Sequence, residues 1–470
     1  MKKITTILSL LIVCFFIFQS HAKNKPAKHQ TISPIVLQTP IRPAGQTDVV
    51  NLVTPALPTV RVGFIGLGMR GPGAVKRFTK IPGVEIIALC DLHADRVKKA
   101  QKLLTDAGLQ PAAEYSGSQD EWKKLCQRND IDLVYICTDW IDHAPMMIYA
   151  MEHGKHVACE VPAAMNMQEI WDVINTAERT RKHCMQLENC VYDFFELTTL
   201  NMAQKGVFGD LVHVEGAYIH CLDEYWNDYD DDWRMKYNKA HRGDVYATHG
   251  LGPACQLLNI HRGDKMNYLV SMDTDPISLP VFLKNKRNEN VSDFKNGDHT
   301  ITLIRTEKGK TIEIQHDVAN PRPYSRKYEL TGTKGFAQKY PVQGYAISSD
   351  NAQSAGIKNF ENLNAHKFLS EENKKAIMEQ YRSPILTPEL EATAKKVGGH
   401  GGMDFIMDYR LIYCLQNGLP LDMDVYDLAE WCCLGALTSI SLENNSAPVA
   451  IPDFTRGAWQ KQIGFRYAFK

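Results

Sequence analysis

The glycine-rich turn from Gly66 to Gly71, with Gly68 between them, constrains the fold of this chain most strongly. It follows an apolar stretch at residues 60–65 that is typical of a buried strand, and it precedes a helical pattern at residues 74–81. Glycines at this GxGxxG spacing let the backbone turn tightly and approach a pyrophosphate at the helix N-terminus. The flanking strand and helix favour a dinucleotide site over a glycine-rich turn of an ordinary α/β protein.

An acidic residue supports this interpretation. Asp91 ends a second apolar stretch, residues 84–90, and stands 20 residues after Gly71. A carboxylate in that place accepts hydrogen bonds from ribose hydroxyls and repels a 2′-phosphate. The sequence therefore predicts NAD rather than NADP as the cofactor.

The pattern of elements divides the chain into two fold classes. Helical and strand-like stretches alternate through residues 59–190, which predicts an α/β Rossmann domain with a doubly wound parallel sheet. Strands separated by short turns follow in residues 191–470, which predicts an α+β domain with an open, mostly antiparallel sheet. We expect this second domain to hold the substrate and to support oligomerisation. Its two closing helices, near residues 402–415 and 425–441, could pack back on the Rossmann domain.

The N-terminus has the layout of a secretory signal peptide. Lys2 and Lys3 precede about 12 apolar residues, and small residues precede a cleavage site after Ala22. A transmembrane anchor is the alternative, but the apolar run is too short to span roughly 30 Å of hydrocarbon. We therefore expect residues 1–22 to be a signal peptide and the mature protein to be periplasmic or secreted, with no membrane span. Residues 23–58 are polar and contain several prolines, which is typical of a linker.

Composition excludes several classes of partner and site. A formal net charge of −1 gives no reason to expect a nucleic acid partner. The 12 cysteines contain no CxxC pair, so a structural zinc site has no support and we expect no metal. Their spacing shows no disulfide framework, and we interpret them as small buried apolar residues.

A tripeptide after the last strand of the first domain relates the chain to known families. Glu160-Val161-Pro162 resembles the Glu-Lys-Pro of the Gfo/Idh/MocA oxidoreductases, in which the lysine handles the proton during alcohol oxidation. Valine cannot titrate, so an ordinary reversible dehydrogenase does not fit at this position. One branch of that superfamily carries this substitution, namely glycoside hydrolase family 109, the NAD-dependent α-N-acetylgalactosaminidases.

The resemblance to glycoside hydrolase family 109 covers most of residues 59–470. It rests on the motifs at residues 66–71, 140–143, 160–162, 246–253, 321–326, 398–402 and 452–457. The family's cofactor contacts then fall on Gly66, Gly68, Met69, Arg70, Gly71, Asp91, Trp140, His143, Glu160, Val161, Asn189 and Tyr218. Its substrate contacts fall on Tyr218, Arg234, Tyr246, His249 and Tyr324. Tyr328 is an alternative for Tyr324, and His220 and His400 are further neighbours.

The resemblance implies a redox-neutral glycosidase. NAD oxidises C3 of a terminal α-N-acetylgalactosamine, which acidifies the C2 proton; the C1 substituent leaves by elimination, water adds, and C3 is reduced again. Such a cycle needs groups that move protons at the C3 hydroxyl and at C2. The catalytic candidates are His249 for the hydroxyl and Tyr218 or Tyr246 for C2, provided that a cation such as Arg234 depresses the phenol pKa.

Other interpretations remain open at this point. Taken singly, a histidine in a glycine-rich turn or a tyrosine on a strand is more often structural. A paired-carboxylate glycosidase would use the acidic cluster at residues 223–232, which is more typical of a solvated loop. An exported NAD-dependent sugar or cyclitol dehydrogenase and a non-catalytic sugar- or nucleotide-binding protein are the alternative functions. For a glycosidase, the partners are a glycan ending in N-acetylgalactosamine and further copies of the chain in a homodimer or higher homo-oligomer.

Overall fold

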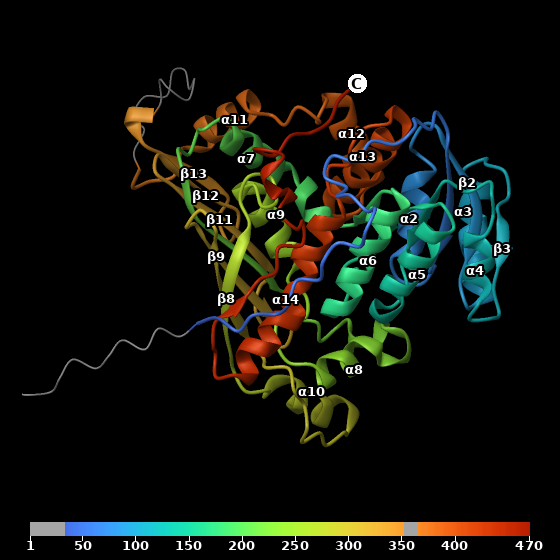
Figure 1. Ribbon diagram of the computed structural model, residues 1–470, viewed down its shortest axis with the longest axis horizontal. Coiled ribbons are helices and arrows are strands. Elements are labelled where there is room, and N and C mark those ends of the chain that lie inside the picture. Colours follow the sequence, from blue (N-terminus) through green and yellow to red (C-terminus); the bar gives the residue numbers. More distant parts are fainter. Residues whose placement is uncertain (1–32, 352–364) are drawn as a thin grey trace, which may run out of the picture. The chain divides into compact units, whose positions relative to one another are not determined.

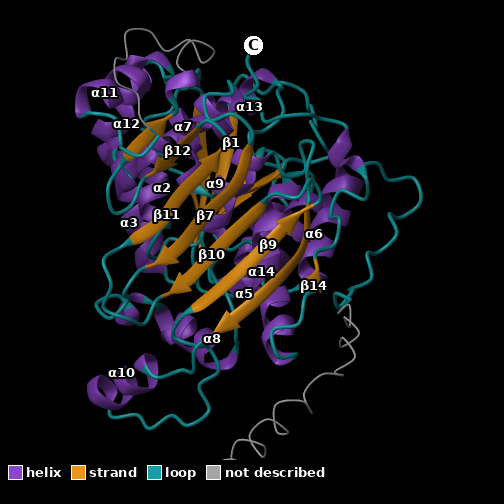
Figure 2. Cartoon of the chain, turned by 90° about the vertical axis from the view of Figure 1, so that its left-hand side faces the viewer, coloured by secondary structure: helices purple, strands orange, loops and turns teal. Residues whose placement is uncertain are grey.

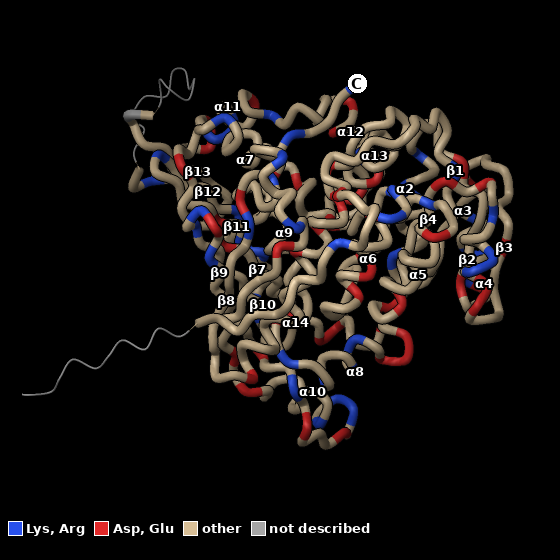
Figure 3. The backbone as a smooth tube through the Cα atoms, in the orientation of Figure 1, with Lys and Arg blue, Asp and Glu red and all other residues tan. Residues whose placement is uncertain are grey.

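The computed structural model describes residues 33–351 and 365–470 (Figure 1). The predicted signal peptide and the first part of the predicted linker lie outside these residues. Within the described ranges, no helix combines the length and apolar character needed to cross a membrane. Acidic and basic residues are interspersed along the described chain (Figure 3).

A parallel sheet forms the first layer of the structure. In the described residues it has six strands in the order β3-β2-β1-β4-β5-β6, which is the doubly wound order of a Rossmann fold. The strands are β1 Val60–Ile65, β2 Val84–Cys90, β3 Ala113–Tyr115, β4 Leu133–Ile136, β5 His156–Cys159 and β6 Cys184–Gln186. The helices between them are α2 Gly71–Phe78, α3 Ala94–Asp106, α4 Glu121–Cys126, α5 Trp140–Glu152 and α6 Met167–Thr180. This arrangement confirms the predicted Rossmann sheet.

A second, larger sheet follows in the chain. Its order among the described residues is β13-β12-β11-β7-β10-β9-β8-β14, with β7 and β10 parallel and the other described pairs antiparallel. The strands are β7 Leu211–Ile219, β8 Met266–Asp273, β9 Thr300–Thr306, β10 Thr311–Asp317, β11 Ser325–Gly332, β12 Gly335–Gln338, β13 Gly344–Ile347 and β14 Val449–Ala450. The predicted mostly antiparallel α+β class is confirmed.

Helices cover one face of this second sheet and leave the other face open (Figure 2). The helices of this half are α7 Phe194–Gln204, α8 Trp233–Ala240, α9 Thr248–Leu258, α10 Ser278–Arg287, α11 Glu371–Gln380, α12 Pro388–Val397, α13 Met403–Asn417 and α14 Val425–Glu443. Along β9 buried and exposed residues alternate strictly, and Ile301 and Leu303 point to the open side. These two residues stand side by side on the open face, and adjacent exposed apolar side chains, unlike single ones, can form a surface suited to another protein.

Helix α13 joins the second half of the chain to the Rossmann sheet. Its Asp408 accepts a hydrogen bond from the Arg77 guanidinium of α2 at 2.6 Å and another from the Tyr135 hydroxyl of β4 at 2.9 Å. All three side chains are buried. The short 3-10 helix Asn189–Tyr192 spans the proposed boundary between residues 190 and 191.

The segment before β1 has little regular structure in its described part, Pro34 to Pro58. It is nevertheless attached: the Arg42 guanidinium binds the buried Glu178 carboxylate at 2.9 and 3.0 Å, and the Tyr426 hydroxyl accepts a hydrogen bond from the Val49 N–H. The cysteines in the described ranges are all free, and most are buried.

Candidate active site

The glycine turn is shaped so that side chains could not replace its first and last glycines. Gly66 has a φ of +88°, and a Cβ there would lie 2.5 Å from the carbonyl oxygen of Cys137 at the end of β4. A Cβ on Gly71 would overlap the carbonyl oxygen of Gly66. At Gly68, in contrast, the nearest neighbours of a Cβ would be the ends of two side chains, Arg96 at 3.2 Å and Asp230 at 3.9 Å. The turn therefore closes tightly at its base and leaves its middle open to a ligand, as a pyrophosphate cradle requires.

Asp91 anchors this turn at the end of β2. One carboxylate oxygen accepts the Leu67 N–H at 2.6 Å, and the other accepts the His93 N–H at 2.8 Å. Each oxygen retains a further lone pair, and Asp91 lines the cavity beside the turn. The predicted ribose acceptor is thus placed to bind hydroxyl groups.

A cavity of about 720 Å³ opens along the carboxyl ends of the first sheet and extends to α8. Many of the residues predicted from the sequence line it: Gly66, Gly68, Met69, Arg70, Asp91, Trp140, His143, Glu160, Val161, Arg234 and Tyr246. The remaining predicted residues, Gly71, Asn189, Tyr218, His249 and Tyr324, lie outside its lining. The lining combines a nucleotide cradle with side chains of the second domain, so an NAD molecule fits the residues present.

Arg70 connects the cradle to the second domain. Its guanidinium lies 3.4 Å from Glu160 and 3.3 Å from Asp404 at the start of α13. The same Asp404 carboxylate accepts a hydrogen bond from the Asn189 side-chain amide at 2.6 Å and lies 3.0 Å from His400. Burial raises the pKa of Asp404, but His400 and Arg70 lower it more, so the carboxylate stays ionised. This network fixes two predicted cofactor contacts, Arg70 and Asn189.

His143 has a structural task in addition to its place in the lining. Its Nδ1 lies 2.8 Å from the Pro162 carbonyl oxygen and its Nε2 lies 2.9 Å from the Thr138 carbonyl oxygen. Burial lowers the pKa of His143 although both carbonyl groups oppose that shift. A neutral imidazole has one N–H, so His143 donates to one of these two carbonyls, while both of its ring nitrogens face the loops after β4 and β5.

Aromatic rings surround the buried guanidinium of Arg234. It lies 4.7 Å from the ring of Tyr246, 5.1 Å from that of Trp140 and 5.2 Å from that of Tyr229, whose hydroxyl accepts its hydrogen bond. Trp140 and Tyr246 stack at 5.5 Å. Cation–π contacts of this kind are strongest where water is excluded. The arrangement fixes one positive charge beside the cavity.

A tyrosine can act as the base at C2 only if a nearby cation lowers its pKa, and neither Tyr218 nor Tyr246 meets this condition. Burial raises the pKa of Tyr218, and the nearby Arg234 offsets only part of that effect. Burial likewise raises the pKa of Tyr246 well above its usual value. Desolvation of the phenolate outweighs one guanidinium, so both tyrosines stay protonated near neutral pH.

A line of polar and aromatic contacts continues from Tyr218. Its hydroxyl lies 3.1 Å from Nδ1 of His220, and the His220 ring lies 5.1 Å from the half-exposed ring of Tyr324. Tyr328, the alternative position, is buried and donates its hydroxyl to the Glu196 carbonyl oxygen. Of the two tyrosines, Tyr324 is the one beside the predicted site.

The sequence interpretation missed Glu188, which binds His249. Nδ1 of His249 lies 2.7 and 2.9 Å from the two Glu188 carboxylate oxygens, and its Nε2 lies 3.4 Å from the Tyr246 hydroxyl. Glu188 follows β6, whereas His249 stands in the first turn of α9. The sequence feature that could have pointed to this contact was a pair of glycines, Gly250 and Gly252, inside that helix. A Cβ on Gly252 would lie 2.9 Å from Cγ of Glu188, and one on Gly250 would overlap the main-chain nitrogen of Ala217 in β7.

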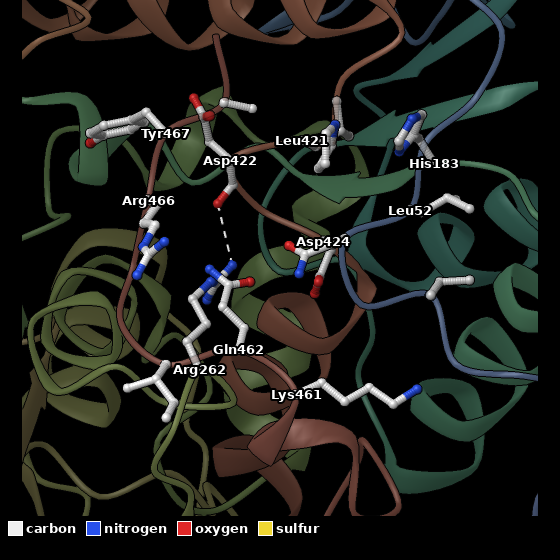
Figure 4. A pocket seen from close by; sticks show the side chains of 15 residues that line it. Leu52, His183, Arg262, Leu421, Asp422, Asp424, Lys461, Gln462, Arg466 and Tyr467 are labelled. Carbon is white, nitrogen blue, oxygen red and sulfur yellow. Dashed lines mark hydrogen bonds between the residues drawn. The ribbon is translucent and has the colours of Figure 1, made fainter.

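A second cavity, of about 560 Å³, lies among residues 49–52, 420–424 and 461–468 (Figure 4). None of the predicted site residues lines it. Its buried Arg262 is held by Asp427 and by the Asp422 carbonyl oxygen, and its Lys461 pairs with Asp48. We assign the active site to the first cavity.

The fold and the first cavity define an NAD-binding protein of the Gfo/Idh/MocA class. Residues 60–187 match the profile described as an oxidoreductase family with an NAD-binding Rossmann fold, and residues 192–461 match that of the glycosyl hydrolase 109 C-terminal domain. The chain belongs to glycosyl hydrolase family 109, and it is therefore a glycosidase with an NAD-binding domain.

Relatives and solved structures agree with this assignment. The chain is 68% identical over 440 residues to a glycosyl hydrolase family 109 protein of Bacteroides fragilis, covering 94% of this chain and 95% of the relative. It is 62% identical over 472 residues to one of Bacteroides thetaiotaomicron, with both chains fully covered. Among solved structures, an NAD binding oxidoreductase from Klebsiella pneumoniae matches with a TM-score of 0.62 at 18% identity, covering 84% of this chain and 100% of that chain. That likeness shows the fold.

Proposed function

We propose that this glycosidase hydrolyses terminal α-N-acetylgalactosamine from glycans by a redox-neutral cycle at C3, C2 and C1 of the sugar. The observation that carries the proposal is the lining of the first cavity. It contains the buried Val161 where related oxidoreductases keep a lysine, and no lysine lines it among the residues that the structure describes. With no lysine there, we assign the proton transfers to His249 and Tyr218, which contact Tyr246 of the lining.

Bound NAD supplies reversible oxidation of a sugar hydroxyl, so oxidation and reduction cancel within one turnover. We assign the C3 hydroxyl proton to His249, whose Nε2 lies 3.4 Å from the hydroxyl of Tyr246 in the cavity lining. Arg234 places a positive charge beside Tyr246 in the lining of the first cavity. This charge attracts electron-rich oxygen atoms, including the amide carbonyl oxygen of the sugar.

Tyr218 and His220 form a proton relay suited to C2. Burial, Arg234 and His249 all lower the pKa of His220, so its imidazole is neutral at neutral pH. A neutral His220 with a bare Nδ1 accepts the Tyr218 proton while the tyrosine oxygen takes the proton from C2. Such a relay needs no phenolate in the resting enzyme, which agrees with the raised pKa of Tyr218.

We also propose that residues 1–22 direct export, so that the enzyme meets its glycans in the periplasm or outside the cell. The support is the charged and apolar pattern of the N-terminus. A redox-neutral cycle suits such a location, because the tightly bound cofactor needs no external reductant or oxidant.

The test uses 4-nitrophenyl α-N-acetylgalactosaminide in deuterated water, with wild-type protein and His249→Ala. We expect wild type to release nitrophenol and to place deuterium at C2, and we expect the variant to lose both. Nitrophenol release without deuterium at C2 contradicts the elimination route. Steady NADH accumulation with free sugar and added NAD would instead indicate a dehydrogenase.

A further inference from the structure

The buried carboxylate of Glu188 has a place in the site that the proposed proton transfers leave unassigned. Glu188 is fully buried, and both of its oxygens lie within 2.9 Å of Nδ1 of His249. The main-chain N–H of Cys190 donates to one of them at 3.0 Å. An ionised carboxylate only accepts hydrogen bonds, so Nδ1 carries a proton.

Taking a carboxylate out of water is costly, and this one is retained by specific packing. Gly252 leaves room for its Cγ, and the imidazole and the Cys190 N–H supply its hydrogen bonds. Although burial raises the pKa of Glu188, His249 and these hydrogen bonds lower it below the ordinary value. The carboxylate is therefore ionised, and it is built into the fold at the point where it meets the imidazole.

Other groups face His249 from the elements packed around it. The Tyr246 hydroxyl lies 3.4 Å from Nε2, and the Tyr218 ring centre lies 5.5 Å from the imidazole centre. His220 interacts with it electrostatically, and Cys190 lies within 4.8 Å of the same nitrogen and carboxylate atoms. Glu188 is the one of these groups that is both negatively charged and hydrogen-bonded to the ring.

The spacing of Glu188, Cys190 and His249 could also suggest a cation site, but the sulfur atom argues against it. The Arg326 guanidinium lies 2.7 Å from Sγ of Cys190, so a positive charge is already in place. Burial raises the pKa of Cys190 well above its usual value, which keeps it a thiol and a poor ligand.

We infer that Glu188 is a positioning residue that fixes His249 in the tautomer with a bare Nε2 and stabilises the imidazolium formed when that nitrogen takes a proton. This inference rests on the proposed role of His249 in the glycosidase reaction. An aspartate has the same relation to the histidine of serine proteases, where replacement by the amide leaves the geometry intact and presents the wrong tautomer.

The test replaces the carboxylate with its amide, E188Q, in the full-length enzyme with NAD bound. We expect kcat to fall by roughly 100- to 1,000-fold with KM within about threefold, because the tautomer affects proton transfer more than binding. E188D keeps the charge but shortens the side chain by one methylene, so its kcat should lie between those of wild type and E188Q.

The matched control is E430Q. Glu430 holds Nδ1 of His261 at 2.8 Å, and both side chains are buried, but neither lines the first cavity. E430Q should therefore reproduce the general effect of removing a buried carboxylate while kcat stays within about twofold of wild type. NAD retained through purification checks folding of every variant.

One measurement separates this inference from the proposed function. The ¹⁵N spectrum of histidine-labelled protein, with the His249 signal identified by its loss in His249→Gln, should show a protonated Nδ1 and a bare Nε2 in wild type. That measurement needs no substrate, so it stands if N-acetylgalactosaminides are not cleaved. A wild-type spectrum with protonated Nε2, an unchanged kcat in E188Q, or loss of activity on adding EDTA would each overturn the inference.

Discussion

The two sheets of this chain bury their residues in different ways. Every residue of β4 and β5 in the parallel sheet is buried, because helices pack against both faces. In the second sheet, β9 alternates buried and exposed residues along its whole length. The same chain thus contains one sheet closed on both faces and one sheet with an open face.

This difference decides where each sheet contributes to the site. A sheet covered on both faces can offer polar groups only at its strand ends, and Gly66, Asp91 and Glu160 all stand there. The half-covered sheet contributes from the face of a strand instead, because Tyr218 lies within β7 on the buried side.

Replacing Gly71 with alanine should damage the strand-end site most. A Cβ there overlaps the Gly66 carbonyl oxygen, so the turn must open, and we expect NAD affinity to fall by roughly 100-fold or more. Titration of NAD into protein freed of cofactor measures the loss. Gly73→Ala in the same helix is the control, because a Cβ there meets nothing closer than the Arg77 guanidinium at 3.5 Å. Equal affinities for the two variants would contradict the assignment.

Asp408→Ala tests the attachment of α13 to the closed sheet. It removes the closer of the two carboxylates that face the buried Arg77, leaving only Asp404 at 3.6 Å, and it removes the acceptor of the Tyr135 hydroxyl. Breaking a buried ion pair from one side costs about 3–5 kcal/mol in the free energy of unfolding, which urea denaturation measures. Asp95→Ala removes the exposed pair with Lys99 and should leave that free energy unchanged. If Asp408→Ala unfolded at the same urea concentration as wild type, the contacts of Asp408 with Arg77 and Tyr135 would not be needed for stability.

The open face is expected to matter least for folding and most for assembly. We propose that it binds a second copy of the chain, because Leu303 and Ile301 are exposed on it. Leu303→Glu should therefore dissociate the oligomer in light scattering while changing the free energy of unfolding by about 0.5 kcal/mol or less. Ile277→Glu, an exposed position before α10, should leave the oligomer intact. An unchanged mass for Leu303→Glu would place the interface elsewhere.

The closed sheet was predictable from the sequence because its strands are continuous apolar runs between helices. The cofactor site at its strand ends was predictable from the spacing of Gly66, Gly68 and Gly71 and from the position of Asp91. The short strands β12, β13 and β14 were missed, since segments of two to four residues carry little periodic signal.

The side-chain partnerships were beyond sequence reasoning for a different reason. Glu188 and His249 are far apart in the chain and meet because α9 packs against the 3-10 helix Asn189–Tyr192, which Glu188 precedes. The sign of the tyrosine pKa shifts depends on burial, which a sequence does not give. Asp230, expected to face solvent, is exposed but also binds Arg96 and lines the cavity.

The glycines of α9 have a consequence for how this family can diverge. Gly252 and Glu188 occupy one volume between them, so residue 252 cannot gain a side chain while Glu188 keeps its length. We expect residue 252 to accept a side chain only in relatives whose residue 188 is shorter. In an alignment of the family, positions 188 and 252 should then covary, and that covariation would reflect their contact in the active site.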